Sequence, residues 1–365
     1  MPHFKKSRMD GFAVRAEDTF GAEENNLISL KLKEIIEAGD IPQRIVSEGQ
    51  CSYVATGAAI PEGADAVVMI EYSDKRDNDE ILISKAVSPG TYVIEIGHDI
   101  KKDEVICKKG KKIDLPTLGV LASCGIGELQ VLKKPKVALI STGNELVSHE
   151  ISDLPIGKIY DVNSIVLENA ISNTGVEVNY LGIVKDDFGE LSAKVEKALH
   201  ESDIVILSGG TSKGEGDLGP RILDQYDSIE LMVHGVKIKP GKPIVYAKFN
   251  QNLNHKMIFI LPGYPTSSLS CFFVFVDEFL RKLTGKKLRK QFAKELEVGE
   301  RIYSSIGRYH FKPVILKEIN GVEQIFPIQT GSEAISTLFY SDGYIIIEEL
   351  EEIVEKGDKK RFYTY

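Results

Sequence analysis

Continuous apolar strands that alternate with amphipathic helices dominate the middle of this chain and restrict its fold more than any other feature. Residues 136–142 (KVALIST), 176–184 and 204–210 (IVILSGG) are rich in apolar residues, and residues 162–175 and 187–203 carry apolar residues at helical spacing. Such strands are typical of a parallel sheet that helices cover on both faces. The sequence therefore predicts an α/β domain whose ligand binds at the carboxyl ends of the strands.

Two other patterns flank this domain. Residues 31–106 hold short alternating apolar stretches broken by glycine and proline, which are typical of a small all-β unit. In residues 108–131, Asp114 and Pro116 predict the start of a helix, and we expect a strand to follow it. Alternating apolar residues in 306–350 predict a small β-barrel or sheet. The expected fold is multidomain: a β-rich domain, a central three-layer α/β domain and a small C-terminal β-barrel.

Composition excludes several classes of protein. The 365 residues carry a net charge of −9, which disfavours a nucleic-acid partner. The four cysteines form no CxxC pair and the seven histidines show no helical metal-ligand spacing, so a structural zinc site is not expected. Apolar runs are far shorter than the roughly 20 residues that span a bilayer. We therefore expect a cytoplasmic protein without a membrane partner.

Polar, glycine-rich turns end two of the predicted strands. Residues 141–146 read STGNEL, and residues 208–217 read SGGTSKGEGD. Glycines allow backbone N–H groups to surround an anion, and hydroxyl groups add donors. A helix N-cap explains the first turn equally well, and a surface loop is the alternative for the second. The residues expected to contact a phosphate-bearing ligand are Ser141, Thr142, Gly143, Ser208, Gly209, Gly210, Thr211 and Ser212.

Two proline-rich turns follow further along the chain. In KPGKP, the prolines and glycine stiffen the backbone, so that Lys239 and Lys242 become fixed charges for an oxyanion. In LPGYPTSS, Pro262 precedes a turn that opens a helix and exposes N–H groups beside Ser267. A solvated basic turn and a plain strand-to-helix turn are the alternatives.

Acidic residues recur beside these turns, and together they could hold a divalent cation that bridges carboxylates and phosphates. Taken singly, each is more often a solvated surface charge. The candidates are Asp10, Asp99, Glu145, Asp186, Asp187 and Asp217.

Seven sequence blocks resemble a single family. In chain order they read SRMDGFAV, ATGAAIPEGADAVV, STGNEL, GKIYDVNS, SGGTSKGEGD, VKIKPGKP and LPGYPTSS. The chain thereby resembles the molybdenum insertases, or molybdopterin molybdenumtransferases, the family of MoeA and the gephyrin E-domain, without the usual helical stretch before the first block. The resemblance implies four parts: residues 1–9 with 99–133 as the remnant of an elongated linker and dimer domain, a β-rich domain at 10–98, the molybdopterin-binding α/β domain at 134–285, and the β-barrel at 286–365.

The resemblance also implies a reaction and its participants. Adenylylated molybdopterin and molybdate would react with Mg²⁺ present, yielding molybdenum cofactor and AMP. A homodimer is implied, with molybdopterin adenylyltransferase and apo-molybdoenzymes as transient partners. Departures such as Lys213 leave open whether molybdate or tungstate is preferred.

Residue roles follow from the resemblance alone. The implied catalytic acids are Asp10, Asp99, Glu145, Asp187 and Asp217, and the implied Mg²⁺ ligands are Glu145, Asp186, Asp187 and Asp217. Asp161 and Asn163 would contact the pterin nucleotide. Lys239, Lys242 and Ser267 would face molybdate, with Arg308 and Ser332 from the barrel.

Two rival functions stay open at this stage. A molybdopterin adenylyltransferase shares the α/β domain, although the flanking domains favour the insertase. A non-catalytic scaffold like gephyrin is the other rival, and the presence of the acids and lysines above argues against it.

Overall fold

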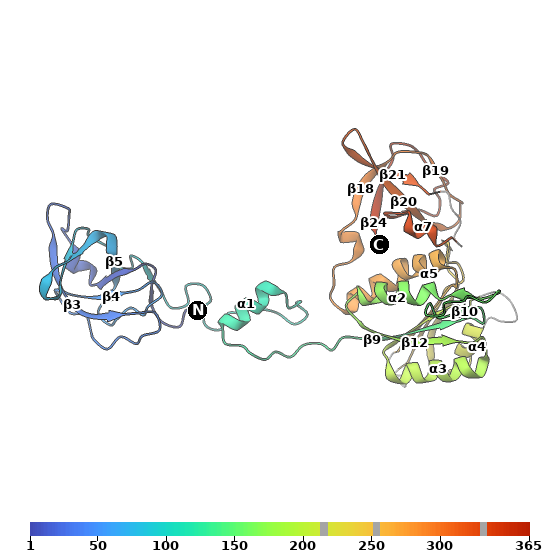
Figure 1. Cartoon of the computed structure of the whole chain (residues 1–365), viewed down its shortest axis with the longest axis horizontal. Helices are drawn as coiled ribbons and strands as arrows, with labels where there is room; N and C mark the ends of the chain where they lie inside the picture. Colours follow the sequence, from blue (N-terminus) through green and yellow to red (C-terminus); the bar gives the residue numbers. More distant parts are fainter. Residues whose placement is uncertain (212–217, 251–255, 329–333) are drawn as a thin grey trace. The chain divides into compact units, whose positions relative to one another are not determined.

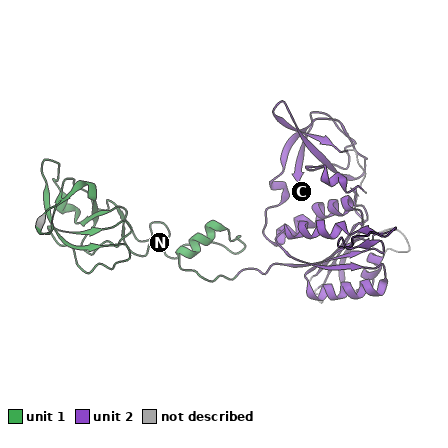
Figure 2. Ribbon diagram, in the orientation of Figure 1, with its two compact units in different colours: residues 1–130 green, residues 131–365 purple. Residues whose placement is uncertain are grey.

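The computed structural model describes residues 1–211, 218–250, 256–328 and 334–365. It divides into two compact units, residues 1–130 and 131–365 (Figure 2). No helix in the described ranges is both long and apolar enough to span a bilayer.

A six-stranded sheet forms the body of the first unit (Figure 1). Its core contains the buried residues Val14, Leu30, Cys51 and Ile81. The pairing is antiparallel except between β3 and β4. The β-rich region is thus confirmed, and it begins earlier than residue 31. In sheet order the strands are β5 (Ala66–Met69), β2 (Gly11–Val14), β4 (Gln50–Val54), β3 (Ile28–Ile36), β7 (Glu80–Ile83) and β6 (Ser73–Lys75).

Short elements complete this unit. Strands β1 (Lys6–Ser7) and β8 (Val93–Ile94) pair with each other. The 3₁₀ turns are Ala16–Thr19, Ile70–Tyr72 and Asp77–Asp79.

Helix α1 (Leu115–Ser123) begins where the sequence predicts it. Asp114 caps it by accepting a hydrogen bond from the backbone N–H of Thr117 at 3.1 Å, and a proline occupies its first turn. The strand expected after it is wrong: residues 124–135 are described and contain none. A strand needs a neighbour for its backbone hydrogen bonds, and no described strand pairs with this segment.

A six-stranded mixed sheet forms the centre of the second unit. Strands β12, β9, β13 and β17 are parallel, as predicted, but β16 and β14 run antiparallel to their neighbours. The connection from β14 to β16, residues 235–244, is shorter than the dozen or more residues that a parallel crossover needs. In sheet order the strands are β12 (Glu177–Val184), β9 (Lys136–Thr142), β13 (Ile204–Ser208), β17 (Met257–Leu261), β16 (Val245–Phe249) and β14 (Ile229–His234).

Helices cover both faces of this sheet, giving three layers (Figure 1). Leu139 of β9 packs among residues of α2, α5 and α6, whereas its neighbour Ile140 packs among residues of α3 and α4. Successive strand residues point to opposite faces, so an apolar strand is buried on both sides. The helices are α2 (Val162–Ser172), α3 (Phe188–Glu201), α4 (Leu218–Leu223), α5 (Pro265–Cys271) and α6 (Asp277–Leu283), with a π-helical turn at Phe272–Val276.

The last part of the chain closes into the predicted barrel, because β20 pairs with β22 as well as with β21. Strand β15 (Ile238–Lys239) of the α/β domain adds to β20 and so joins barrel and sheet. The barrel strands are β18 (Lys294–Val298), β20 (Tyr309–Ile319), β21 (Val322–Pro327), β22 (Gly343–Ile347) and β24 (Lys359–Thr364). Smaller elements are β10 (Leu146–Val147), β11 (Ile159–Tyr160), β19 (Ile302–Tyr303), β23 (Ile353–Val354), α7 (Ser336–Phe339) and a 3₁₀ turn at Arg289–Gln291.

Stacked aromatic rings hold the barrel against the α/β domain. Phe273 lies 5.6 Å from the ring of Tyr344, which stacks on Phe311 at 4.3 Å. The guanidinium of Arg289 lies 4.3 Å above the ring of Phe273 and is paired with buried Asp277. These contacts fix the position of β20 relative to the sheet.

Candidate functional site

The carboxyl ends of the central strands bring the predicted turns to one edge of the sheet. Ser208 at the end of β13 lies in register with Ser141 of β9 on one side and Leu261 of β17 on the other. Thr142 lies opposite Val184 of β12. Blocks that are far apart in the sequence therefore meet at the edge where α/β proteins bind ligands.

An asparagine in the first turn of α2 ties these strand ends together. The amide of Asn163 donates to the hydroxyl of Ser208 at 2.9 Å and to the carbonyl of Gly263 at 2.7 Å. The same amide thus holds the turn after β13 and the turn after β17. Asn163 is half-buried, and its hydrogen bond to Ser208 is part-buried, whereas that to Gly263 is exposed.

Asp161 fixes the start of α2. Its buried carboxylate accepts from the backbone N–H of Ser164 at 3.1 Å and from the hydroxyl of Tyr180 at 2.7 Å. Burial, and then the hydrogen bond to Asp161, raise the pKa of Tyr180 to about 12. Tyr180 was not singled out from the sequence, where it is one aromatic residue of a strand; only its partner across the fold reveals its role.

The two consecutive aspartates after β12 lie in different environments. Asp186 accepts from the hydroxyl of Thr142 at 2.9 Å and from the backbone N–H of Asn144 at 3.1 Å. Asp187 instead caps α3 by accepting from the backbone N–H of Glu190 at 2.9 Å. The carboxylate of Asp186 therefore lies beside the STGNEL turn, while that of Asp187 is engaged at the helix end.

Glycine is required where the turns approach each other. A Cβ on Gly209 would lie 2.3 Å from the carbonyl oxygen of Thr142, and the φ of Gly209 is +105°. A Cβ on Gly143 would lie 2.8 Å from both carboxylate oxygens of Glu145. Gly209 thus permits a close backbone approach, whereas Gly143 makes room for the carboxylate of Glu145 in its own turn.

The KPGKP turn packs tightly on α5. A Cβ on Gly241 would lie 2.4 Å from the sulfur of Cys271, and the φ of Gly241 is +111°. The hydroxyl of Ser270 donates to the carbonyl of Pro240 at 2.8 Å. This turn exposes Lys239 and Lys242 to solvent beside the helix that carries Ser267.

Barrel strand β20 adds two basic side chains at this turn. His310 pairs in register with Lys239, and Lys312 follows two residues later. Burial is the largest cause that lowers the pKa of His310 to about 4, and the positive charges of Lys239 and Lys312 lower it further. Burial is also the largest cause that lowers the pKa of Lys312, and the positive charge of Lys239 is the second cause. Neither residue was predicted, although the two-residue spacing in YHFKP was a signal that both lie on one face of a strand.

Three other predicted residues lie on separate elements. Asp10 and Asp99 belong to the first unit, where the carboxylate of Asp10 accepts from the backbone N–H of Thr56 at 2.7 Å and Asp99 is exposed. Arg308 is exposed just before β20. The roles expected for these three stay predictions. Ser212, Lys213, Asp217 and Ser332 lie outside the described residues.

The described residues do not by themselves form a magnesium site. Glu145 and Asp186 both flank the STGNEL turn, but within the described ranges no group of three or more His, Cys, Asp or Glu could hold a metal ion. Mg²⁺ usually takes one or two carboxylates together with substrate phosphates and water.

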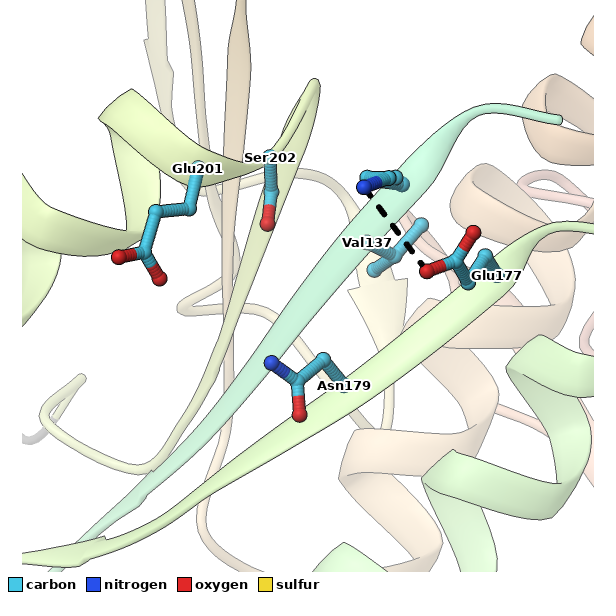
Figure 3. A pocket seen from close by; sticks show the side chains of 6 residues that line it. Val137, Glu177, Asn179, Glu201 and Ser202 are labelled. Carbon is cyan, nitrogen blue, oxygen red and sulfur yellow. Dashed lines mark ion pairs between the residues drawn. The ribbon is translucent and has the colours of Figure 1, made fainter. Parts of the chain in front are cut away.

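A separate cavity of about 360 Å³ opens at the opposite, amino end of β9 and β12 (Figure 3). Lys136 and Glu177 face each other across it, with 4.0 Å between charged atoms, and both are more than half exposed. None of the predicted motifs reaches it. Its other lining residues are Val137, Asn179, Glu201 and Ser202.

Three family models match consecutive parts of the chain. Residues 1–125 match "MoeA N-terminal region (domain I and II)", residues 138–282 match "Probable molybdopterin binding domain", and residues 295–364 match "MoeA C-terminal region (domain IV)".

Individual relatives agree with these models. The chain is 37% identical to a Methanocaldococcus jannaschii protein described as a putative molybdopterin biosynthesis protein, over 98% of this chain and 85% of the relative. It is 31% identical to the molybdopterin molybdenumtransferase of Haemophilus influenzae, over 98% and 86% of the two chains. A crystal structure of the MoeA molybdopterin biosynthesis protein from Pyrococcus horikoshii superposes with a TM-score of 0.85 at 36% identity, covering 100% of this chain and 88% of the other. The chain therefore belongs to the MoeA family of molybdenum cofactor biosynthesis proteins.

Proposed function

We propose that this protein is a molybdopterin molybdenumtransferase, which inserts molybdate into adenylylated molybdopterin and releases AMP. The observation that carries the proposal is the proximity of two sets of polar groups. Asn163 holds Gly263 just before α5, and the KPGKP turn is hydrogen-bonded to Ser270 within α5. Because α5 has seven residues, it is only roughly 10 Å long. The expected phosphate-binding edge and the expected oxyanion-binding turn are thus close to each other, which suits a reaction between a nucleotide and an oxyanion.

The chain's own residues would bind and orient both substrates. The turns after β9 and β13 offer backbone N–H groups and hydroxyls, including Thr211, to the phosphate part of the nucleotide. Lys239 and Lys242 would attract the tetrahedral dianion. The sulfurs of molybdopterin are soft ligands suited to the metal, and cleavage of the phosphoanhydride makes insertion effectively irreversible.

Mg²⁺ and the first unit remain further parts of the proposal. Glu145 and Asp186 are the described acids best situated to approach a substrate-bound Mg²⁺, with Asp217 and Asp187 as the other expected ligands. Asp10 would act from the β-rich part of a second copy in a homodimer, and Asp99 would be a further active-site acid. The same proposal includes a cytoplasmic location and transient binding of an adenylyltransferase and apo-molybdoenzymes. It also includes the division of the chain into four parts, which are residues 1–9 with 99–133, 10–98, 134–285 and 286–365.

One assay tests this function directly. Purified protein is incubated with adenylylated molybdopterin, molybdate and Mg²⁺, and AMP release is measured together with activation of an apo-molybdoenzyme. Release of AMP and activation are expected together, and both should cease when molybdate or Mg²⁺ is omitted. Absence of AMP release with all components present contradicts the proposal. Consumption of ATP with unadenylylated molybdopterin would instead identify an adenylyltransferase.

A further inference from the structure

Strand β12 carries a tyrosine whose hydroxyl reaches the start of α2. Tyr180 pairs in register with Leu139 of β9, and both side chains lie on the face of the sheet that α2, α5 and α6 cover. The phenol donates to Oδ2 of Asp161 at 2.7 Å. Burial raises the pKa of Tyr180 to about 12, so the phenol keeps its proton at neutral pH and remains a donor.

The buried carboxylate of Asp161 depends on that donor. Among the described residues, Oδ1 of Asp161 accepts from the backbone N–H of Ser164 at 3.1 Å, and Oδ2 accepts from Tyr180. A buried carboxylate oxygen that loses its donor costs free energy, because its hydration has already been given up. The phenol therefore fixes the orientation of the Asp161 carboxylate.

Asp161 in turn fixes the residue that ties the strand ends together. It is the N-cap of α2, and Asn163 is the second residue of that helix. The amide of Asn163 must meet both the hydroxyl of Ser208 and the carbonyl of Gly263. Hydrogen bonds weaken steeply as their geometry departs from the optimum, so an amide with two partners on different turns tolerates little movement of its backbone. The contacts thus run from Tyr180 through Asp161 to the turns after β13 and β17.

Another tyrosine of the same sheet offers a contrast. Tyr246 of β16 lies on the same face, with its ring 5.0 Å from that of Phe259. No hydrogen bond among the described residues joins its hydroxyl to Asp161 or Asn163. The two tyrosines therefore share their layer of the fold and differ in their connection to α2.

We infer that Tyr180 is a positioning residue of the carboxyl edge: through Asp161 it orients Asn163, and with it the turns that would hold the phosphate of the nucleotide. That the ligand is a nucleotide rests on the proposed function, whereas the coupling between Tyr180 and Asn163 does not. The hydroxyl of Tyr180 is occupied by Asp161, so the tyrosine acts through Asn163 and not on the ligand itself.

Calorimetric titration of AMP into the full chain measures this coupling. The proteins compared are the wild type, Tyr180→Phe, Asn163→Ala and the double variant, each well below its melting temperature. Tyr180→Phe should bind AMP about tenfold more weakly, because Asn163 is no longer held against both turns. The double variant should bind AMP within about twofold of Asn163→Ala, since changes that act through one unit do not add. A tyrosine that only stabilises the fold would lower the melting temperature and leave AMP affinity unchanged.

Tyr246→Phe is the matched control, because it removes the same group from the same face of the sheet. It should bind AMP like the wild type. A second measurement needs no ligand: in hydrogen exchange followed by mass spectrometry, peptides from the start of α2 should exchange about tenfold faster in Tyr180→Phe and unchanged in Tyr246→Phe.

Three results would overturn the inference: a wild type that does not bind AMP, a Tyr180→Phe variant that binds AMP within about twofold of the wild type, or losses that add in the double variant. Unchanged exchange at the start of α2 in Tyr180→Phe would overturn it as well. Failure of the proposed function looks different: AMP binding and exchange would respond to Tyr180→Phe as expected, yet the wild type would release no AMP from adenylylated molybdopterin.

Discussion

The two ends of the central sheet differ in how they use polar residues, although the same strands run between them. At the amino end, Lys136 and Glu177 are more than half exposed around an open cavity. At the carboxyl end, Ser208 is buried and Asn163 half-buried, and Asn163 joins segments that lie 45 and 100 residues further along the sequence. An open cavity is therefore a weaker indication of function here than buried polar groups converging from distant segments.

The largest effect is expected from adding a methyl group to Gly209. Gly209→Ala would force a Cβ within 2.3 Å of the carbonyl of Thr142 at a positive φ. Strain and overpacking together should lower the free energy of unfolding by about 4 kcal/mol and abolish AMP release. Gly182→Ala is the control, since Gly182 also has a positive φ, +92°, but its Cβ would meet nothing within 4 Å. Urea denaturation of both variants measures the difference, and equal destabilisation would contradict the close approach.

Acid should destabilise the fold through His310, the buried histidine of β20. The pKa of His310 is lowered from 6.5 to about 4, so the unfolded chain takes up this proton before the folded chain does. The resulting stability is present above pH 6.5 and is lost as pH falls from 6.5 to about 4, by about 3 kcal/mol in all. The free energy of unfolding, measured by denaturation at several pH values across that range, should depend less steeply on pH in His310→Gln than in the wild type. The control is His200→Gln, a change in an exposed histidine at the end of α3, which should keep the steep dependence. Identical slopes in the wild type and His310→Gln would contradict the assigned burial.

The two asparagines at opposite ends of the sheet allow a direct comparison. Asn163→Ala removes hydrogen bonds of 2.9 and 2.7 Å to the strand ends, and should lower kcat/KM for AMP release by roughly 30-fold, or about 2 kcal/mol. Asn179→Ala changes a residue that lines the cavity at the amino end and should leave kcat/KM within about twofold of the wild type. If Asn179→Ala proves the more damaging, the catalytic edge has been assigned to the wrong end of the sheet.

The smallest effect is expected at the amino end itself. Lys136→Met removes an exposed pair with a charged-atom distance of 4.0 Å, and pairs of this kind contribute about 0.5 kcal/mol or less. Both the melting temperature and the rate of AMP release should remain close to wild-type values. A substantial loss of activity with unchanged stability would show that the cavity in Figure 3 takes part in the reaction.

Local patterns predicted the elements whose environment is uniform along their length. Residues 136–142 and 204–208 are continuous apolar runs, and both are central parallel strands. Asp114 and Pro116 correctly located the start of α1. The strand expected after α1 was wrong because an apolar pattern cannot show whether a neighbouring strand is available. The antiparallel edge at β14 and β16 was missed for a similar reason, since strand direction depends on the connection and not on the strand residues.

The candidate site divides in the same way. Glycines, hydroxyls and lysines in the turns could be identified from residue type alone, because chemistry such as anion binding by backbone N–H groups is local. Sequence alone could not separate the environments of Asp186 and Asp187, which are adjacent but engage different elements. It also missed Tyr180, whose importance depends on a partner 19 residues away.

The sequence by itself determined the family, the layered α/β domain with its flanking β regions, and the turns able to bind anions, because hydrophobic periodicity and turn chemistry act over a few residues. Only the tertiary structure decided which carboxylate lies beside the STGNEL turn, that Asn163 joins two strand ends, and that β20 brings Lys312 and His310 beside Lys239. Those facts depend on burial and on distances between remote segments, and both arise only when the sheet, helices and barrel have packed together.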